Sequence, residues 1–333
     1  MFRTDVCPST LAAGDGTFSR SAQRRLFNGR PVNHVLDFPS PLTASDPDPK
    51  QLLGTRDRIS ISGYQPKFSL VQDRGSLRLT HSGEQGAFIL KPVPADVPNG
   101  AVLPANEHLT MQIAAQVYGI QTAANALVFF PDGQPAYLTK RFDLAEGGGK
   151  IHMEDFASLT GKTSDTDGKD YKYSGSYEDI GWLIRQIVPA WRPVTEQFFR
   201  LVVFNYLFSN GDAHLKNFSL IRSPFGDYVL SPAYDLLDSS FHVNDTYFAL
   251  KDGLLRPGGD RHNSGRPTKK DFLLLGERLD LPGQRVERTL AGFLNGRSTV
   301  EDLIQRSFLP LNFQRSYLAN FNGRVKVLAP APR

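Results

Sequence analysis

The most informative segment of the chain reads Asn210-Gly211-Asp212-Ala213-His214-Leu215-Lys216-Asn217-Phe218. An apolar helix is predicted just before it, over Phe198–Leu207, and a β-hairpin just after it, over residues 218–230. Within the segment, Asp212 and Asn217 stand five positions apart. Polar side chains on a loop that is fixed at both ends by buried elements indicate a candidate functional site.

Asp235 extends this pattern, because it follows the predicted hairpin in the sequence Ala233-Tyr234-Asp235. A protein-kinase catalytic loop needs an Asp that accepts the proton of a hydroxyl and, five residues later, an Asn that binds magnesium. A second Asp past the hairpin holds the metal on the phosphates. Carboxylate and amide oxygens are suitable Mg²⁺ ligands. We therefore predict Asp212 as the catalytic base and Asn217 and Asp235 as metal ligands.

Two further side chains of the loop are candidates with open roles. His214 is expected to tie the loop to the core through a hydrogen bond rather than to transfer a proton, and it borders the nucleotide site. Lys216 either faces the γ-phosphate as a point charge or is a solvated loop lysine.

A second candidate segment, Ser60-Ile61-Ser62-Gly63-Tyr64-Gln65-Pro66-Lys67, precedes the first predicted strand. Backbone N–H groups in a tight turn can cradle phosphate oxygens, and a small residue lets the backbone approach. Only Gly63 is a glycine here, so an ordinary loop is the alternative. The predicted ATP-binding residues of this segment are Ser62, Gly63, Tyr64, Gln65, Pro66 and Lys67.

Lys91 follows the short apolar strand Ala87–Leu90, where an ammonium can reach the α- and β-phosphates or simply extend into solvent. Glu107, on the next helix, is the candidate that holds this lysine, or else a solvated glutamate of a first helical turn. The segment Lys140-Arg141-Phe142 ends the last predicted strand of the first lobe and is expected at the adenine edge. Phe142 lies either under the ring or in the core.

The predicted elements divide the chain into an N-terminal appendage with a Pro-rich linker (1–57), a β-rich nucleotide-binding lobe (58–143) and a helical catalytic and substrate lobe (144–333). The fold class is α+β, a two-lobed protein-kinase-like fold. The expected strands are 67–71, 77–80 and 87–90 as an antiparallel meander, then 126–130 and 136–141. The expected helices are 24–27 with a cap at Ser19 or Ser21, 104–119, 198–207 capped by Thr195, 271–279 capped by Thr268, 283–294, 299–307 and 311–320.

Composition excludes several classes of protein. The 333 residues carry a net charge of +4, and 40% of them are hydrophobic, which is ample for a core. Cys7 is the only cysteine, so an intramolecular disulfide and a Cys-based zinc cluster are excluded. The apolar run 198–208 is too short for a membrane span, and residues 1–5 do not begin a signal peptide. We expect a cytoplasmic protein without direct DNA or membrane binding.

Together these segments resemble the HipA-type toxin kinases of bacterial toxin–antitoxin systems, from about residue 58 to about residue 325. The matching stretches are 60–67, 88–92, 106–108, 141–143, 210–218 and 231–235. The resemblance implies ATP- and Mg²⁺-dependent Ser/Thr phosphorylation of an aminoacyl-tRNA synthetase, which stops charging and arrests growth. It also implies that Lys91 is the nucleotide lysine.

Only 59 residues precede Ser60, fewer than in a full HipA chain. The chain therefore resembles the short form, HipT, in which a small protein, HipS, replaces the missing subdomain beside the DNA-binding antitoxin HipB. The resemblance implies partners of both kinds, autophosphorylation at Ser60 or Ser62, and tryptophanyl-tRNA synthetase as the first candidate target. A phosphoserine would add about −1.5 to −2 charge where ATP phosphates bind.

Two other functions remain open. A small-molecule phosphotransferase on the same fold would line its substrate cleft with acidic residues for a cationic ligand, and no such pattern stands out in the C-terminal helices. A non-catalytic module that binds an antitoxin is disfavoured by the presence of Asp212, Asn217, Asp235 and Lys91.

Overall fold

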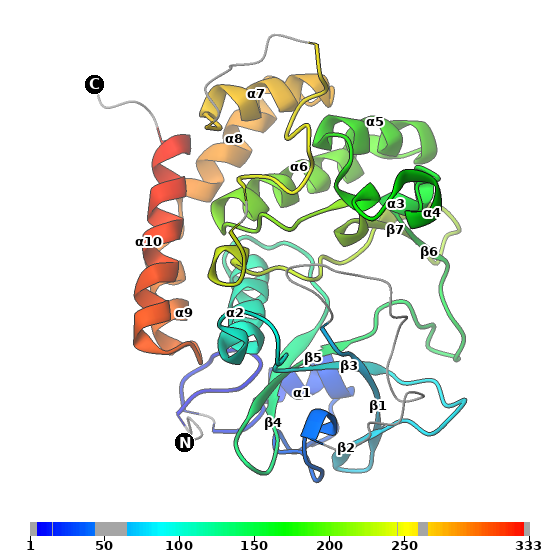
Figure 1. Cartoon of the computed structure of the whole chain (residues 1–333), viewed down its shortest axis with the longest axis vertical. Coiled ribbons are helices and arrows are strands. Elements are labelled where there is room, and N and C mark those ends of the chain that lie inside the picture. The colour runs from blue at the N-terminus through cyan, green and yellow to red at the C-terminus, as the bar shows by residue number, and fades with distance from the viewer. Residues whose placement is uncertain (1–4, 15, 44–64, 245, 259–265, 330–333) are drawn as a thin grey trace.

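The computed structural model describes residues 5–14, 16–43, 65–244, 246–258 and 266–329. They form a β-rich lobe and a helical lobe, with α2 (Leu103–Gln116) between the two (Figure 1). This arrangement confirms the expected α+β, two-lobed fold. No helix within these ranges is both long and apolar enough to cross a membrane.

The first lobe is built on an antiparallel sheet with the strand order β2-β1-β3-β5-β4. Its strands are β1 (Phe68–Asp73), β2 (Ser76–Leu79), β3 (Phe88–Pro92), β4 (Asn125–Phe129) and β5 (Pro135–Lys140). All five lie close to their predicted positions. Their order differs from the expected meander, because β3 pairs with β1 and β2 is left at the edge.

The composition of the two strands explains this order. Only Leu77 is buried in β2, which suits an edge strand, whereas β3 is buried at four of its five positions and has a neighbour on each side. The chain returns to β1 through Gly86, where a Cβ atom would lie 2.8 Å from the backbone carbonyl oxygen of Leu70. A glycine is therefore needed for this close approach of two backbones.

The N-terminal segment covers one face of this sheet. Its helix α1 (Arg20–Phe27) begins at the predicted cap Ser19 and ends at Asn28 in the left-handed conformation. Phe18, Leu26 and Phe27 are buried with the apolar side chains of the sheet in one core. Residues 5–43 are thus integral to the packing of the first lobe.

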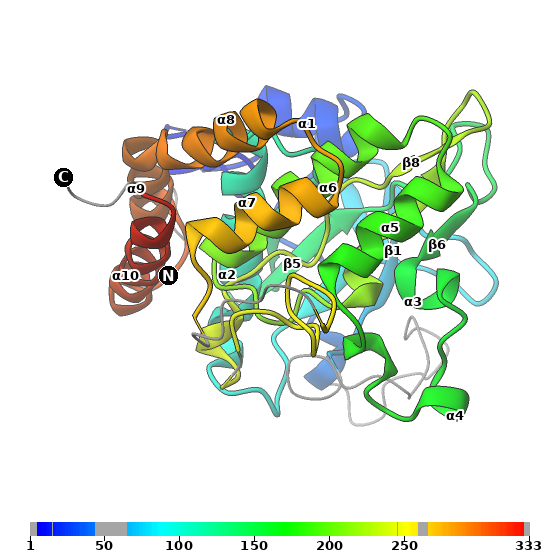
Figure 2. The ribbon, with the colours of Figure 1, turned by 90° about the horizontal axis from the view of Figure 1, so that it is seen from above.

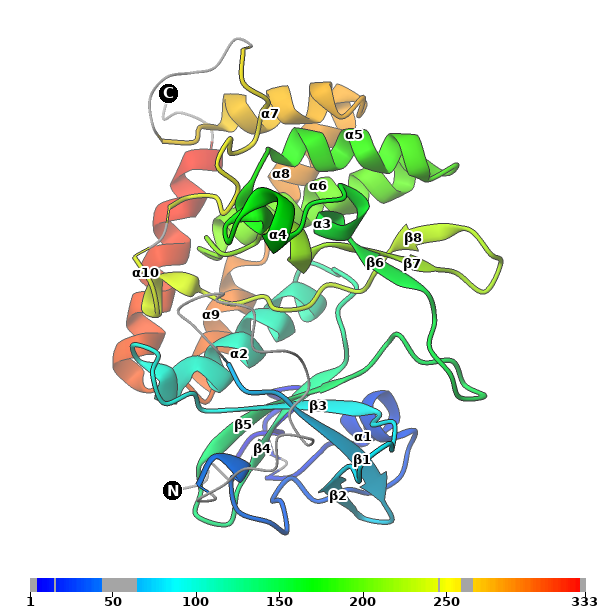
Figure 3. The same ribbon diagram turned by 45° about the vertical axis from the view of Figure 1, so that its right-hand side comes forward.

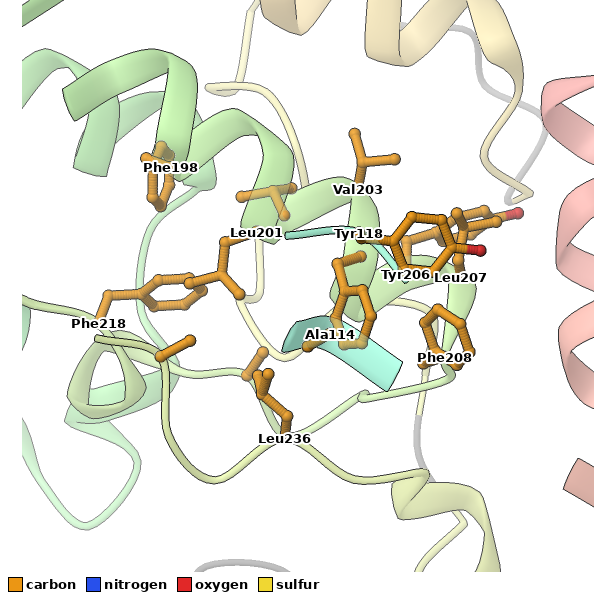
Figure 4. Packing of buried hydrophobic residues seen from close by; sticks show 14 of the residues in the cluster. Ala114, Tyr118, Phe198, Leu201, Val203, Tyr206, Leu207, Phe208, Phe218 and Leu236 are labelled. Atoms are coloured by element: carbon orange, nitrogen blue, oxygen red, sulfur yellow. The ribbon is translucent and has the colours of Figure 1, made fainter. Parts of the chain in front are cut away.

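The opposite face of the sheet packs on α2, whose side chains are buried almost throughout. A second core runs from this face through α2 into the helical lobe, where Phe208 lies near Ala114 and Tyr118 and the cluster continues through Leu201 toward Phe198 (Figure 4). This core is continuous between the two lobes.

The second lobe surrounds the long buried helix α6 (Trp191–Leu207) (Figure 2). This helix begins four residues before Thr195, which is a buried interior residue and not the expected cap. The reason is that Pro193 is tolerated in a first turn, where its missing N–H has no partner to lose. The predicted cap Thr268 does form a capping box with Asp271.

The other elements of this lobe largely follow the prediction. A small sheet, β6-β7-β8, stands beside the helices (Figure 3) and contains the predicted hairpin plus one unforeseen strand. The last helix is longer than expected, and α5 was not individually predicted, although its capping box of Ser176 and Asp179 is visible in the sequence. The strands are β6 (Met153–Asp155), β7 (Ser219–Arg222) and β8 (Tyr228–Leu230), and the helices are α3 (Phe156–Leu159), α4 (Ser164–Asp167), α5 (Tyr177–Ile187), α7 (Lys269–Arg278), α8 (Gly283–Leu294), α9 (Arg297–Arg306) and α10 (Leu311–Leu328).

Candidate active site

Three charged side chains from distant parts of the sequence meet between the lobes. Lys91 of β3 donates a hydrogen bond of 2.7 Å from Nζ to Glu107 Oε1 of α2, and it forms an ion pair with Asp235, which follows β8. Lys91 and Glu107 are 5% and 2% exposed. Two carboxylates thus share one buried ammonium.

The charges of this triad determine its protonation. Burial would lower the pKa of Lys91, but Asp235 and Glu107 outweigh it and raise that pKa above its usual range. Burial likewise opposes ionisation of Asp235, but Lys91 holds the pKa of Asp235 well below its usual range. Burial raises the pKa of Glu107 to about 7, despite the opposing charge of Lys91. Lys91 therefore stays an ammonium that contacts both carboxylates.

The pleat of β3 explains how a lysine reaches this place. Phe88 and Leu90 point into the core under the N-terminal segment, so Lys91 points to the other face, where it lies 5.3 Å from the centre of the Tyr137 ring. It is the ammonium nitrogen that lies over this ring, at the interface of the lobes.

The hydroxyl group of Ser239 holds the backbone of the loop that carries Asp212. Gly211 N donates to Ser239 Oγ at 2.7 Å, and Ser239 Oγ donates to Ser209 O at 2.9 Å. Asp235 has a φ of +55°, a left-handed conformation that an Asp tolerates better than most residues, and Asn210 Nδ2 donates to its carbonyl at 3.3 Å. These bonds fix the two predicted acidic residues relative to each other.

Asn217 lies beside Asp235, as its predicted role requires. Its Nδ2 is 3.3 Å from Asp235 Oδ2, and its Oδ1 accepts from His214 N at 3.1 Å. A carboxylate and an amide side by side match the donors that Mg²⁺ takes from proteins when phosphate oxygens and water complete its shell. Within the described ranges no cluster of three or more His, Cys, Asp or Glu suits a metal.

Asp212 has a partner that the sequence did not reveal. Tyr173 donates from its phenol oxygen to Asp212 Oδ1 at 2.8 Å, and Tyr177 donates to the carbonyl of Ala213 at 2.8 Å. Both tyrosines lie at the start of α5 or just before it, about 40 residues ahead of the loop. No motif signals such a contact, because it depends on how the two segments pack.

His214 is buried beside this tyrosine, with its ring 5.2 Å from that of Tyr173. Its two ring nitrogens make no hydrogen bond to any described residue, so the expected tie to the core is absent there. Burial lowers the pKa of His214 to about 3, which keeps the ring neutral. Lys216 Nζ is 3.7 Å from Asp155 Oδ2, and its carbonyl accepts from Tyr234 OH at 2.8 Å.

The strand-end candidates separate into two groups. Lys140 lies on the same face of β5 as Leu138 and donates to Asn28 Oδ1 of the N-terminal segment at 2.8 Å, so the structure does not bring it to the other site residues. Arg141 forms a bidentate pair with Asp143, at 2.9 and 2.5 Å. Phe142 does reach the lobe interface, with its ring 5.9 Å from that of Tyr234, next to Asp235.

Part of the predicted phosphate loop can be placed. Ser60, Ser62, Gly63 and Tyr64 lie outside the described residues. Pro66 is buried, and Lys67 is near enough to Glu107 and Asp235 to lower the pKa of each.

Unsatisfied polar atoms give a test of whether a polar ligand fits this region. The atoms Gln65 Nε2, Asn210 Oδ1 and both ring nitrogens of His214 are buried, with no hydrogen-bond partner among the described residues. Such atoms are rare in folded proteins and indicate groups that a ligand or water completes. They lie on the predicted phosphate loop and the predicted catalytic loop, so a polar ligand fits between these two segments.

A two-lobed fold with a buried lysine, its two carboxylate partners, an adjoining asparagine and a loop aspartate between the lobes is typical of a kinase-like protein. Comparison with known families matches residues 59–295 to the HipA-like C-terminal domain, which is more than half of the chain. The chain therefore belongs to the family of HipA-like C-terminal domains.

Individual relatives agree with this membership. A Haemophilus influenzae protein named "Putative kinase" is 29% identical over 290 residues, covering 81% of this chain and 82% of that protein. The Sinorhizobium fredii protein named "Putative kinase Y4dM" is 36% identical over 197 residues, covering 55% of this chain but only 45% of that protein. The chain is thus similar in length to the first relative and matches less than half of the second.

Solved structures share the fold. A chain of the Shewanella oneidensis toxin–antitoxin complex of HipA, HipB and operator DNA has a TM-score of 0.60 and 21% identity, covering 83% of this chain and 65% of that chain. The Helicobacter pylori proinflammatory kinase CtkA has a TM-score of 0.50 and 14% identity, covering 79% and 90%. At these identities the likeness establishes the kinase-like fold.

Proposed function

We propose that this chain is an ATP- and Mg²⁺-dependent protein Ser/Thr kinase that acts as the toxin of a toxin–antitoxin system. The observation that carries the proposal is the convergence of Lys91, Glu107, Asn217 and Asp235 on one place between the lobes, with Asp212 on the adjoining loop. Each of these residues was selected from the sequence for one role in phosphoryl transfer.

The residues divide the work as follows. Lys91 binds the α- and β-phosphates, and Glu107 keeps its ammonium directed into the cleft. Asn217 and Asp235 hold Mg²⁺, which when bound neutralises charge on the phosphates. Asp212 accepts the proton of the substrate hydroxyl as that oxygen bonds to the γ-phosphorus and the bond to the leaving ADP breaks.

The substrate and partners follow from the family resemblance. We propose an aminoacyl-tRNA synthetase as the protein substrate, with the tryptophanyl enzyme as the first candidate. The Shewanella neighbour is in a complex with HipB and operator DNA, which supports a HipB-like antitoxin as a partner here. A HipS-like small protein is the second proposed partner, because the chain resembles the short HipT form.

Mass spectrometry of purified synthetases provides the test. Each synthetase is incubated with the chain, ATP and Mg²⁺, and a gain of one phosphate on one of them is the expected result. Asp212→Gln serves as the matched inactive variant, because loss of the base costs about 10²–10⁴ in rate. A phosphate gain only on small alcohols or sugars would instead identify a small-molecule phosphotransferase, and equal growth inhibition by Asp212→Gln would identify a non-catalytic toxin.

Autoregulation at the phosphate loop is a separate part of the proposal. A phosphate on Ser60 or Ser62 places negative charge beside a site that must accept the phosphates of ATP. The double variant Ser60→Asp/Ser62→Asp should therefore bind ATP more weakly in calorimetry, whereas Ser60→Ala/Ser62→Ala should bind like the parent. Equal affinities for the Asp and Ala variants would refute the switch.

A further inference from the structure

Tyr173 makes hydrogen bonds through its backbone and through its phenol to two other segments of the helical lobe. Its backbone carbonyl accepts from Lys251 N at 2.8 Å, in the segment that follows Asp235. Its phenol donates to Asp212 Oδ1 at 2.8 Å. The next residues continue the first contact, because Asp252 N donates to Gly175 O at 3.0 Å. Tyr173 therefore spans the distance between the catalytic loop and the segment around residue 251.

The surroundings of the ring favour this contact. Lys172 Nζ lies 4.9 Å from the centre of the Tyr173 ring, and the neutral imidazole of His214 meets the ring edge-on at 5.2 Å and 79°. Burial and the nearby charge of Asp212 raise the pKa of Tyr173 above its usual range, so the phenol keeps its proton and acts as a donor. A rigid ring packed on two sides loses little entropy by making the bond.

The hydrogen bond has a geometric consequence for Asp212. A donor on Oδ1 fixes the rotation of the carboxylate about its last torsion angle, which is otherwise broad. The orientation of the second oxygen is then fixed as well.

We propose that Tyr173 is a positioning residue, which orients the Asp212 carboxylate toward the hydroxyl of the substrate. This inference rests on the proposed kinase function. The inference predicts that Tyr173 affects the rate of turnover and not the binding of nucleotide. The reason is that its phenol contacts Asp212 and not the triad of Lys91, Glu107 and Asp235. Misplacement of a catalytic group by about 1 Å can cost about 10²-fold in rate.

The test compares Tyr173→Phe with Tyr171→Phe. Tyr171 belongs to the same short turn (Tyr171–Tyr173) and is 8% exposed, and its phenol makes no hydrogen bond within the described part of the chain. Both variants of the full chain are assayed for phosphate transfer from ATP to themselves and to synthetases, and for ATP affinity by calorimetry. We expect Tyr173→Phe to lower kcat by about 10- to 100-fold with ATP affinity unchanged, and Tyr171→Phe to match the parent.

A double-mutant cycle separates positioning from a general structural role. In an Asp212→Ala background the phenol has no carboxylate to orient, so Tyr173→Phe should cause no further loss of the residual rate. An unchanged kcat in Tyr173→Phe, a parallel loss of ATP affinity, or a further loss in the Asp212→Ala background would each overturn the inference. If the parent transfers no phosphate to any of the probes, the proposed function itself fails and this inference fails with it.

Discussion

The same strands build the two faces of the five-stranded sheet, but the faces differ in which segment covers them and in whether they bury charged side chains. The outer face meets the N-terminal segment in an apolar core, with Phe27 and Phe88 in ring contact at 5.5 Å. The inner face buries Lys91 against Glu107 and Asp235. Burial of apolar surface stabilises a fold, whereas burial of charge is costly unless each charge is paired. Both faces therefore contribute apolar packing, but only the inner face also carries the charged cluster to which we assign the proposed function.

The largest expected effect on ATP binding is on the inner face. Lys91→Met removes a charged donor to the phosphates, and a hydrogen bond to a charged group is worth about 1.5–3 kcal/mol, so ATP affinity should fall by about 10- to 150-fold. Unfolding stability should change less than ATP affinity, because Glu107, with its pKa already raised to about 7, takes up a proton once its partner is gone, and Asp235, whose side chain is 29% exposed, keeps the nearby charge of Lys67. Calorimetry with ATP and urea unfolding measure the two quantities.

The outer face should give the reverse result. Phe27→Ala removes a fully buried ring that packs on Phe18 and Phe88, and it should lower the free energy of unfolding by about 3–5 kcal/mol. Below its melting transition the variant should bind ATP like the parent. Two results would contradict the difference that we propose between the faces. One is weaker ATP binding by folded Phe27→Ala, and the other is a loss of unfolding stability in Lys91→Met as large as that in Phe27→Ala.

A pH titration adds a further distinction. Burial lowers the pKa of His108 to about 4, against its hydrogen bond with the carbonyl of Ser9, and burial lowers that of His214 to about 3. Between these values and about 6.5 the unfolded chain binds more protons, so both residues make stability fall as pH falls. Glu107 acts in the opposite direction between 4.5 and about 7, because its folded form holds the extra proton. Between pH 7.5 and pH 5, the two histidines together lower the free energy of unfolding by more than Glu107 raises it.

We therefore expect urea unfolding to show lower stability at pH 5 than at pH 7.5. The variant His108→Gln should have a shallower dependence, since it removes one of the two histidine contributions. Stability that stayed constant or rose between pH 7.5 and pH 5 would mean that these histidines are protonated in the folded state.

The smallest expected effect concerns the helix that covers the outer face. Ser19 Oγ accepts from Ala22 N at 3.3 Å as the cap of α1. Ser19→Ala should cost about 0.5–2 kcal/mol in unfolding stability without any change in ATP affinity. Ser21→Ala is the matched control, because Ser21 was the alternative cap in the sequence and does not have this role. Equal losses of unfolding stability in the two variants would show that the loss does not come from the hydrogen bond of the Ser19 cap.

Local signals in the sequence were sufficient for much of this protein. Helix caps such as Ser19 and Thr268, the hairpin after the catalytic loop and the spacing of Asp212 and Asn217 all depend on residues a few positions apart. The placement of Lys91, Glu107 and Asp235 was also predictable, because their order along the chain matches a known arrangement of elements. Phosphoryl transfer needs all three side chains at one site, so the predicted function also predicts that they lie close together.

The tertiary structure alone decided the features that depend on distant packing. The strand order β2-β1-β3, the start of α6 before Thr195 and the joining of residues 5–43 to the sheet core are choices among locally equivalent arrangements. The contact of Tyr173 with Asp212 belongs to the same group. A sequence pattern fixes which face of an element is apolar, but which partner covers that face is determined by the global fit of the cores.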